Sequence, residues 1–366
     1  MSYKIFQIQP YFDHSEIKNL KKAIKTGWVT EGPFSQEFLK LLKEFTGARY
    51  AAFANNGTLG LFLSLLAIEV KEGDEVIVTD FTFNASASSI AFTGAKPVFV
   101  DINPDDLQMN TAKIEKAITK NTRAIMPVHI YGQSCDMDPI MEIARKYKLL
   151  VVEDAAQGFG VFYKGRHTGT IGDVGMISFF ADKTITTGEG AVVLTNNELI
   201  FNKLKLLRNQ GRPNSGTFIH PELGMNFRMT DLQCALGVAQ IKKYETIEKI
   251  KARNYQLYEA YLKEIPEIEF IKINDFSSFV PFRVNVKVPR LEELIEHLEK
   301  EGIQTRRMFY PLHRQPCFSN LNYNEGDFPG ANEAYQKGMS LPIHCGLKKD
   351  DIKYICSSIK RFYAKQ

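Results

Sequence analysis

A carboxylate and a lysine each follow a short apolar segment near the middle of the chain. Glu153 and Asp154 come directly after Leu149–Val152, and Lys183 follows the apolar segment Gly175–Phe180. Both segments have the length and composition of buried strands. In an open α/β sheet, ligands bind beyond the carboxyl ends of neighbouring strands, so we expect Asp154 and Lys183 to lie at one site.

This pair of side chains suits a cofactor that has a basic ring nitrogen and an aldehyde. Pyridoxal 5'-phosphate (PLP) is such a cofactor, because an aspartate faces its ring nitrogen and a lysine forms a Schiff base with its aldehyde. Most lysines and aspartates are solvated surface groups, so spacing alone leaves a surface role open for both residues.

The segment Asn55–Thr58 provides a candidate site for the phosphate of such a cofactor. It lies between the predicted strand Ala51–Ala54 and the apolar, buried helix Leu59–Ile68. Unpaired N–H groups and the positive end of the helix dipole at this point suit a phosphate. An Asn-Gly pair is also a common turn, which is the alternative reading of this segment.

The elements that must position these residues alternate between strand and helix, which predicts a mostly parallel sheet. Strands are expected at Lys4–Ile8, Ala51–Ala54, Glu75–Val78, Pro97–Val100, Ala124–Val128, Leu149–Val152, Gly175–Phe180 and Ala191–Thr195. Helices are expected at Ser15–Thr26, Leu59–Ile68, Thr111–Ile118, Pro139–Tyr147, Asn197–Arg208 and from Leu232 onward. After Tyr244 the pattern is a charged helix to Ile265, strands Glu269–Ile273, Pro281–Val288 and Gln304–Arg307, a helix Leu291–Glu301, and a helix-rich tail from Asn332 to Phe362.

The segments EDAAQ, GDVGMISFFADK and TITTGEG resemble the DegT-type nucleotide-sugar aminotransferases, a branch of the fold-type-I PLP enzymes. The resemblance covers nearly the whole chain. It implies an α/β fold with a mostly parallel sheet in a large N-terminal PLP-binding domain and a smaller C-terminal α+β domain. We place these domains at residues 1–243 and 244–366, with the first residues able to pack against the small domain.

The resemblance also implies a role for each cofactor-binding residue. Lys183 would carry PLP as a Schiff base and move the proton, Asp154 would keep the ring nitrogen protonated, and Gln157 would bind the phenolic oxygen. Phe83 would stack on the ring, which is worth roughly 0.5–1.5 kcal/mol beyond burial. The phosphate would be held by Gly57, Thr58 and Ser178, and by Asn226 reaching across from the neighbouring subunit of a homodimer.

Four further residues are candidates for substrate binding by the same resemblance. Trp28 lies in the segment GWVTEGP and Arg228 in GMNFR, while Tyr310 and His313 lie in YPLH. Arg228 suits the carboxylate of an amino donor, because arginine binds carboxylates through two hydrogen bonds. A tryptophan wedged under a loop and a structural loop histidine are the alternatives for Trp28 and His313.

The function that the resemblance implies is amino transfer from L-glutamate to a nucleotide-linked keto sugar. The segments HIYGQ, FFADKTITTGEG, LRNQG and YPLHRQP resemble the GDP-perosamine synthase subgroup, which aminates GDP-4-keto-6-deoxymannose. A UDP- or dTDP-linked sugar and amination at C3 remain open. A PLP-dependent sugar dehydratase is disfavoured because those relatives have histidine in place of Lys183, and a non-catalytic regulator is disfavoured because Lys183 and Asp154 are both present.

Composition excludes other classes of protein. The formal net charge is +4, and basic residues do not form a block interleaved with aromatics, so we expect no nucleic-acid partner. The five cysteines form no CxxC pair, which argues against a disulfide framework and a zinc site, and we expect no metal. The sequence shows no signal peptide and no apolar run of about eighteen residues, so we expect a cytoplasmic protein without a membrane partner.

Overall fold

The computed structural model describes residues 3–214 and 216–364, and its centre is a seven-stranded sheet. The strand order is β1-β9-β8-β5-β4-β2-β3. The strands are β1 (Tyr50–Ala54), β2 (Glu75–Thr79), β3 (Lys96–Val100), β4 (Thr122–Met126), β5 (Leu150–Asp154), β8 (Val174–Ser178) and β9 (Ala191–Thr195). All neighbouring strands are parallel except β9, which is antiparallel to β1 and β8. The expected mostly parallel sheet is confirmed.

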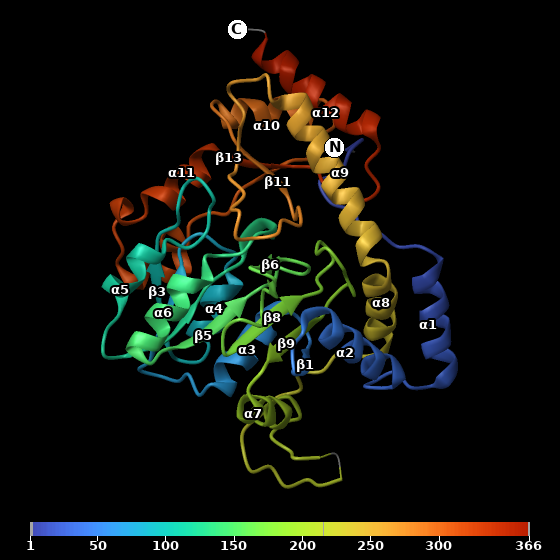
Figure 1. Ribbon diagram of the computed structural model, residues 1–366, viewed down its shortest axis with the longest axis vertical. Helices are drawn as coiled ribbons and strands as arrows, with labels where there is room; N and C mark the ends of the chain where they lie inside the picture. Colours follow the sequence, from blue (N-terminus) through green and yellow to red (C-terminus); the bar gives the residue numbers. More distant parts are fainter. Residues whose placement is uncertain (1–2, 215, 365–366) are drawn as a thin grey trace.

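Helices cover both faces of this sheet (Figure 1). They are α1 (His14–Thr26), α2 (Pro33–Thr46), α3 (Gly57–Ala67), α4 (Ala85–Ala91), α5 (Ile114–Ala117), α6 (Met137–Tyr147), α7 (Glu198–Arg208) and α8 (Asp231–Lys242). Successive strand residues point to opposite faces. On β9, Val193 therefore packs in the core cluster that contains Leu61 of α3, whereas Val192 and Leu194 pack in the cluster that contains Phe38 of α2.

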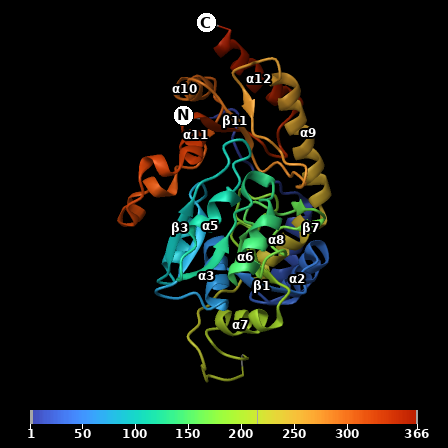
Figure 2. The ribbon, with the colours of Figure 1, turned by 60° about the vertical axis from the view of Figure 1, so that its left-hand side comes forward.

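A second, four-stranded sheet follows in the order β10-β11-β13-β12, and all its strand pairs are antiparallel. The elements of this part are α9 (Tyr244–Leu262), β10 (Glu269–Phe270), β11 (Val284–Lys287), α10 (Leu291–Lys300), β12 (Arg306–Arg307), α11 (Pro329–Lys337), β13 (Gly338–Leu341) and α12 (Lys349–Tyr363). Figure 2 shows α9, α10 and α12 around β11 at the end of the molecule opposite α7. The segment at the N-terminus joins this part, because the N–H groups of Lys4 and Ile5 donate to the carbonyl of Gly302 at 2.9 and 3.1 Å.

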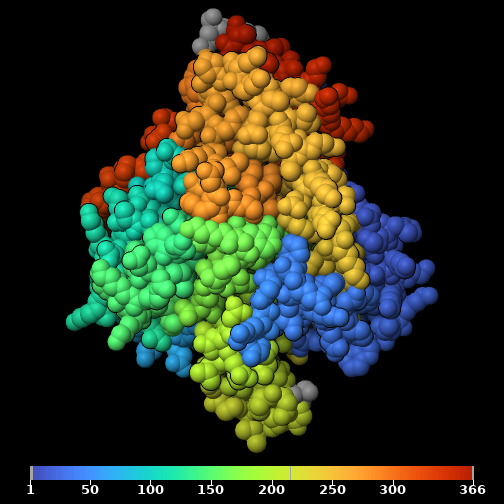
Figure 3. All heavy atoms as spheres, viewed as in Figure 1, coloured from blue at the N-terminus to red at the C-terminus, as the bar shows by residue number. Residues whose placement is uncertain are grey.

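The C-terminal part is also tied to the large sheet. The short hairpin of β6 (Phe162–Tyr163) and β7 (Arg166–His167) contacts the C-terminal part, because the Phe162 N–H donates to Ser278 Oγ at 2.8 Å. In Figure 3 the orange surface of the C-terminal part lies directly on the green surface of the large-sheet part. Met308, Leu312 and Phe328 pack in the same core cluster as the large sheet, and the division at residue 243 stays a prediction.

Local structure differs from the sequence expectations at several places. The expected strand Lys4–Ile8 is a single bridge between Ile5 and Ile303, and the expected helix Thr111–Ile118 is a short 3₁₀ turn followed by α5. Helix α2 was not expected, although its buried Phe34, Phe38 and Leu42 have helical spacing. Strand β13 lies in the tail that was expected to be helical. The sequence pattern missed it because its hydrogen-bond partners are β11 and β12, which are distant in sequence.

The loop between α7 and α8 projects from the end of the molecule opposite the C-terminal part (Figure 3). Its Phe218, Ile219 and Leu223 side chains are almost fully exposed. Within residues 3–214 and 216–364, no helix is long and apolar enough to span a membrane.

Candidate active site

A cavity of about 440 Å³ opens between the carboxyl ends of the central strands and the small sheet. The large-sheet side supplies the two predicted catalytic residues and most predicted cofactor-binding residues, namely Gly57, Thr58, Phe83, Asp154, Gln157, Ser178 and Lys183. The facing wall includes Phe282, Arg283, Arg306, Arg307 and Ser340. The fold therefore brings together in one cavity side chains that are more than a hundred residues apart.

Asp154 is the last residue of β5, and its side chain is almost fully buried. Its Oδ2 accepts a hydrogen bond from Ser86 Oγ at 2.7 Å, and its Oδ1 accepts one from the Ala156 N–H at 3.0 Å. Burial raises the pKa of Asp154 above its usual range. A cationic group beside the carboxylate would reverse this shift, so Asp154 fits the protonated ring nitrogen of PLP.

Lys183 lies in the loop that follows β8. Its backbone N–H donates a hydrogen bond to the Phe180 carbonyl, which closes a turn in this loop. Its side chain is 14% exposed, and Nζ lies 3.5 Å from Asp182 Oδ1. Burial lowers the pKa of the Lys183 amine, and nearby Arg283 lowers it further. A lysine with a depressed pKa is neutral more often, which a nucleophile or a base requires.

The start of α3 forms a cradle for an anionic group. The first N–H groups of a helix have no acceptor within the helix, and those of Gly57 and Thr58 lie at the cavity. A Cβ at Gly57 would lie 3.2 Å from Ser178 Oγ and Cβ, so glycine lets the start of α3 pack closely against the end of β8. This geometry fits the phosphate of PLP.

Gln157 fixes a second wall of the cavity. Its Oε1 accepts a hydrogen bond from the Tyr131 N–H at 2.7 Å, which holds Tyr131 in a left-handed backbone conformation with a φ of 58°. The Tyr131 ring stacks on Phe309 with a centroid distance of 5.5 Å. The side-chain oxygen of Gln157 is thus engaged, and only its NH₂ group can donate to a ligand.

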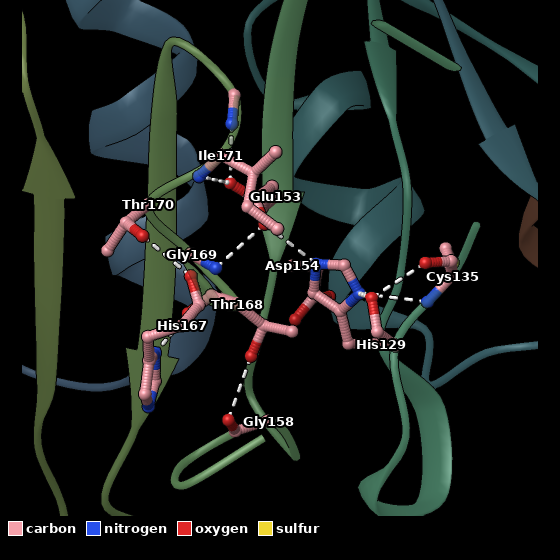
Figure 4. A network of polar contacts seen from close by, with 12 residues as sticks. His129, Cys135, Glu153, Asp154, Gly158, His167, Thr168, Gly169, Thr170 and Ile171 are labelled. Carbon is pink, nitrogen blue, oxygen red and sulfur yellow. Dashed lines mark hydrogen bonds and ion pairs between the residues drawn. The ribbon is translucent and has the colours of Figure 1, made fainter. Parts of the chain in front are cut away.

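A buried network beneath the cavity holds Asp154 in place (Figure 4). Glu153 points to the opposite face of β5, where its carboxylate accepts hydrogen bonds from the N–H groups of Gly169, Ile171 and Gly172 at 2.6–2.7 Å. His129 Nε2 lies 2.9 Å from the same carboxylate. The His129 backbone N–H also donates to the Asp154 carbonyl at 2.9 Å, so the network connects the 169–172 loop to the end of β5.

We expect Glu153→Gln to lower the free energy of unfolding by about 3 kcal/mol or more, because it breaks a buried pair and faces its NH₂ group toward N–H donors. Burial by itself would raise the pKa of Glu153, but the hydrogen bonds from His129, Gly172 and Gly169 lower it. Its stabilisation is therefore present above the unfolded pKa and is lost as the pH falls through the folded pKa. Urea denaturation at neutral and acidic pH measures this, with the exposed Glu115→Gln, whose effect should be small, as the control.

Three predicted site residues lie outside the cavity of a single chain. Trp28 is 60% exposed, and Asn226 is exposed and accepts a hydrogen bond at 2.9 Å from Arg228 Nε. Their two segments lie side by side, because Thr30 and Thr230 form a bridge. The roles of these three residues stay predictions.

The predicted substrate segment is also outside the cavity lining. Tyr310 is 39% exposed and packs edge-on against Tyr335. The side chain of His313 is buried, and its Nδ1 lies 2.7 Å from Asp80 Oδ2. The His313 ring stacks on Phe328 at 4.6 Å, so the histidine fastens this segment to the end of β2. Direct contact of Tyr310 and His313 with substrate stays a prediction.

Several residues at the site were not identified from the sequence. Ser86 holds Asp154 from α4, Asp182 lies beside Lys183, and Phe282 and Arg283 close the cavity from the small sheet. Ser86 lies in an ordinary small-residue helix, and the two residues before β11 lie in a segment with no motif. Only Asp182, directly before the lysine, has a position in the sequence that could have marked it.

The comparisons with known proteins show the family of the chain and its fold. The model of the DegT/DnrJ/EryC1/StrS aminotransferase family matches residues 10–360. The GDP-perosamine synthase of Caulobacter vibrioides is 37% identical over 96% of each chain, and the dTDP-4-amino-4,6-dideoxy-D-glucose transaminase of Shigella dysenteriae is 37% identical over 91% of each. The PLP form of Spr1654 from Streptococcus pneumoniae superposes with a TM-score of 0.94 at 27% identity, covering 99% of both chains.

The fold and the cavity define a PLP-dependent sugar aminotransferase. The chain belongs to the DegT/DnrJ/EryC1/StrS aminotransferase family. The expected family, fold class, cofactor and enzyme class are thereby confirmed, and the non-catalytic alternative is set aside.

Proposed function

We propose that this enzyme transfers an amino group from L-glutamate to a nucleotide-linked 4-keto-6-deoxy sugar, converting GDP-4-keto-6-deoxymannose to GDP-perosamine. The observation that carries the chemistry is the cavity in which Asp154 and Lys183 lie together at the ends of the paired strands β5 and β8. The start of α3 beside them supplies N–H donors for an anion.

Bound PLP supplies a carbonyl carbon for attachment of the amine and a ring that accepts electrons. Lys183 would be the attachment site. Its freed Nζ would move a proton from the amino-donor carbon to the cofactor carbon, and in the second half-reaction from the cofactor carbon to the sugar carbon. Asp154 holds the proton on the ring nitrogen. The N–H groups of Gly57 and Thr58 and the Ser178 hydroxyl hold the phosphate, while Gln157 donates through its NH₂ group. Phe83, 62% exposed at the cavity rim, would stack on the ring.

The charges of the cavity support an anionic substrate. Its lining includes four basic side chains, Lys183, Arg283, Arg306 and Arg307, and three acidic ones, Asp154, Asp182 and Glu189. Arg306 is exposed and makes no ion pair within the described residues. An arginine in this position can bind the carboxylate of glutamate or the diphosphate of a nucleotide.

The GDP-linked substrate is supported by the similarity to GDP-perosamine synthase from Caulobacter vibrioides. A dTDP- or UDP-linked 3- or 4-keto sugar is the second candidate, because the dTDP-sugar transaminase of Shigella dysenteriae has the same 37% identity. A sugar dehydratase is disfavoured by Lys183, which can return the amine to the sugar.

A panel of GDP-, UDP- and dTDP-linked 4-keto-6-deoxy sugars, each with L-glutamate, tests this assignment. We expect the GDP-linked sugar to have the highest kcat/KM, by at least about tenfold, because each buried polar group that a wrong base leaves unpaired costs about 1–3 kcal/mol. At least tenfold higher kcat/KM for a UDP- or dTDP-linked sugar would contradict the choice of nucleotide and leave the aminotransferase assignment intact.

We also propose a homodimer with shared active sites. Asn226 and Arg228 lie on a surface that exposes Trp28, Val29 and Met225, which is typical of a buried interface. Across such an interface, Asn226 would reach the phosphate in the partner's cavity, and Arg228 would reach the carboxylate of the amino donor.

A further inference from the structure

Asp182 lies between the proposed cofactor lysine and a buried arginine. Its Oδ2 accepts a hydrogen bond from Arg283 Nη2 at 2.6 Å. Its Oδ1 lies 3.5 Å from Lys183 Nζ. This Oδ1 is buried and has no hydrogen-bond donor among residues 3–214 and 216–364. One oxygen of the carboxylate is therefore committed to Arg283, while the other is aimed at the lysine.

Arg283 is held firmly in its place. Its side chain is 7% exposed, and its Nη1 donates to Gln7 Oε1 at 2.6 Å. Its Cζ lies 4.6 Å from the centroid of the Phe282 ring, and Lys183 Nζ lies 4.8 Å from the same centroid. The ion pair between Asp182 and Arg283 thus connects the lysine loop of the large sheet to the entry of β11 in the small sheet.

Four charged side chains lie near the Lys183 amine. Asp182 precedes it on its own loop, Asp154 faces it from β5, and Arg283 faces it from the small sheet. Lys251 of α9 is also buried nearby, and its Nζ lies 5.8 Å from the Phe282 ring. A buried acceptor without a donor costs free energy, so Oδ1 of Asp182 is a favourable resting place for a freed lysine amine.

We propose that Asp182 is a positioning residue whose unpaired Oδ1 receives the Lys183 ammonium and holds it at the edge of the cavity, while Arg283 limits this attraction. The proposal rests on the proposed attachment of the cofactor to Lys183. Arg283 serves two purposes here: it orients the carboxylate, and its positive charge opposes protonation of the lysine.

This arrangement predicts opposite effects for the two partners. Asp182→Asn removes the negative charge and leaves Lys183 beside Arg283 and Lys251, so the pKa of Lys183 should fall. Arg283→Gln removes a nearby positive charge and leaves the negative charge of Asp182 uncompensated, so the pKa of Lys183 should rise. If the two residues acted only through packing, the pKa of Lys183 would shift in the same direction in both variants or would not shift in either.

The test measures the charge state of Lys183 in the full-length protein after removal of PLP. A limiting amount of acetic anhydride labels neutral amines, and mass spectrometry of the peptide containing Lys183 gives its labelling rate against pH. We expect Asp182→Asn to label at least about tenfold faster near neutral pH, since one pKa unit corresponds to tenfold in the neutral fraction. Arg283→Gln should label more slowly than the unaltered protein.

A second readout uses the PLP-loaded protein, whose visible absorption is titrated with pH. Its midpoint should shift downward in Asp182→Asn and upward in Arg283→Gln. The matched control is Asp138→Asn, which removes a surface carboxylate paired with Lys164 and should leave both readouts of Lys183 unchanged. Unchanged midpoints in both variants, or shifts of the same sign, would overturn the proposal.

Two further measurements keep the outcomes separate. Borohydride reduction and peptide mapping identify the lysine that carries PLP. A reduced cofactor on another lysine would contradict the attachment to Lys183 without affecting the acetylation rates of Lys183 in the two variants. If Asp182→Asn does not fold, as judged by circular dichroism, Asp182→Ser removes the same charge with a smaller side chain. The upward shift in Arg283→Gln remains decisive in either case.

Discussion

Asp154→Asn is expected to lower turnover by at least about 100-fold while the fold is retained. Each tenfold loss corresponds to about 1.36 kcal/mol of activation barrier. Asparagine has nearly the same shape, and its oxygen can still accept the hydrogen bond from the Ala156 N–H. An amide carries no charge, so it cannot stabilise a proton on the ring nitrogen. Steady-state kinetics with saturating PLP measures the loss.

The same substitution should raise the melting temperature of the PLP-free protein at neutral pH. The pKa of Asp154 is raised by burial, so its ionised form is less stable in the folded chain than in the unfolded chain. Stability of the PLP-free protein therefore falls as the pH rises from the unfolded pKa through the folded pKa, and asparagine removes this loss. Lower activity together with higher stability distinguishes an electrostatic role from a packing defect.

The surface variant Asp138→Asn is a suitable control, because its carboxylate is exposed and remote from the cavity lining. It should leave turnover and melting temperature nearly unchanged. Near-normal turnover of Asp154→Asn would show that Asp154 does not face the ring nitrogen, and the cavity would then need another partner for that atom.

Mixing two inactive variants, Lys183→Ala and Asn226→Ala, is expected to restore activity. If Asn226 acts in the partner's cavity, each heterodimer contains one site with both substitutions and one site with neither. Random exchange of subunits leaves about a quarter of all sites intact in a symmetric dimer. Dissociation and reassembly at equal concentrations, followed by the glutamate-dependent assay, measures this recovery from near zero.

Differently tagged subunits allow the heterodimer to be purified and its activity measured directly. A mixture of Lys183→Ala with Asp154→Ala is the matched control, because both residues line the cavity of one chain. If both residues act in the cavity of their own chain, every site in that mixture carries one of the two substitutions. The mixture should therefore stay inactive. Purified Lys183→Ala/Asn226→Ala heterodimers without activity would contradict the shared site.

The sequence by itself determined the parts of the site that depend on local order. Asp154 and Lys183 follow apolar strand segments, and Gly57 and Thr58 open an apolar helix, so their places at strand and helix ends were predicted from hydrophobic patterns. The carboxyl ends of parallel strands meet at one edge of a sheet, and Asp154 and Lys183 accordingly line the same cavity. The family resemblance supplied the identity of the cofactor.

Only the tertiary structure decided which distant groups surround these residues. Arg283 lies 101 positions after Asp182 in the chain, and no local sequence pattern predicts the ion pair between them. The sequence left His313 open as a substrate ligand or a structural residue, and only the tertiary structure shows that its side chain is buried against Asp80. Such contacts arise from the packing of the small sheet onto the large one, and their energies depend on burial, which a periodicity in one segment does not specify.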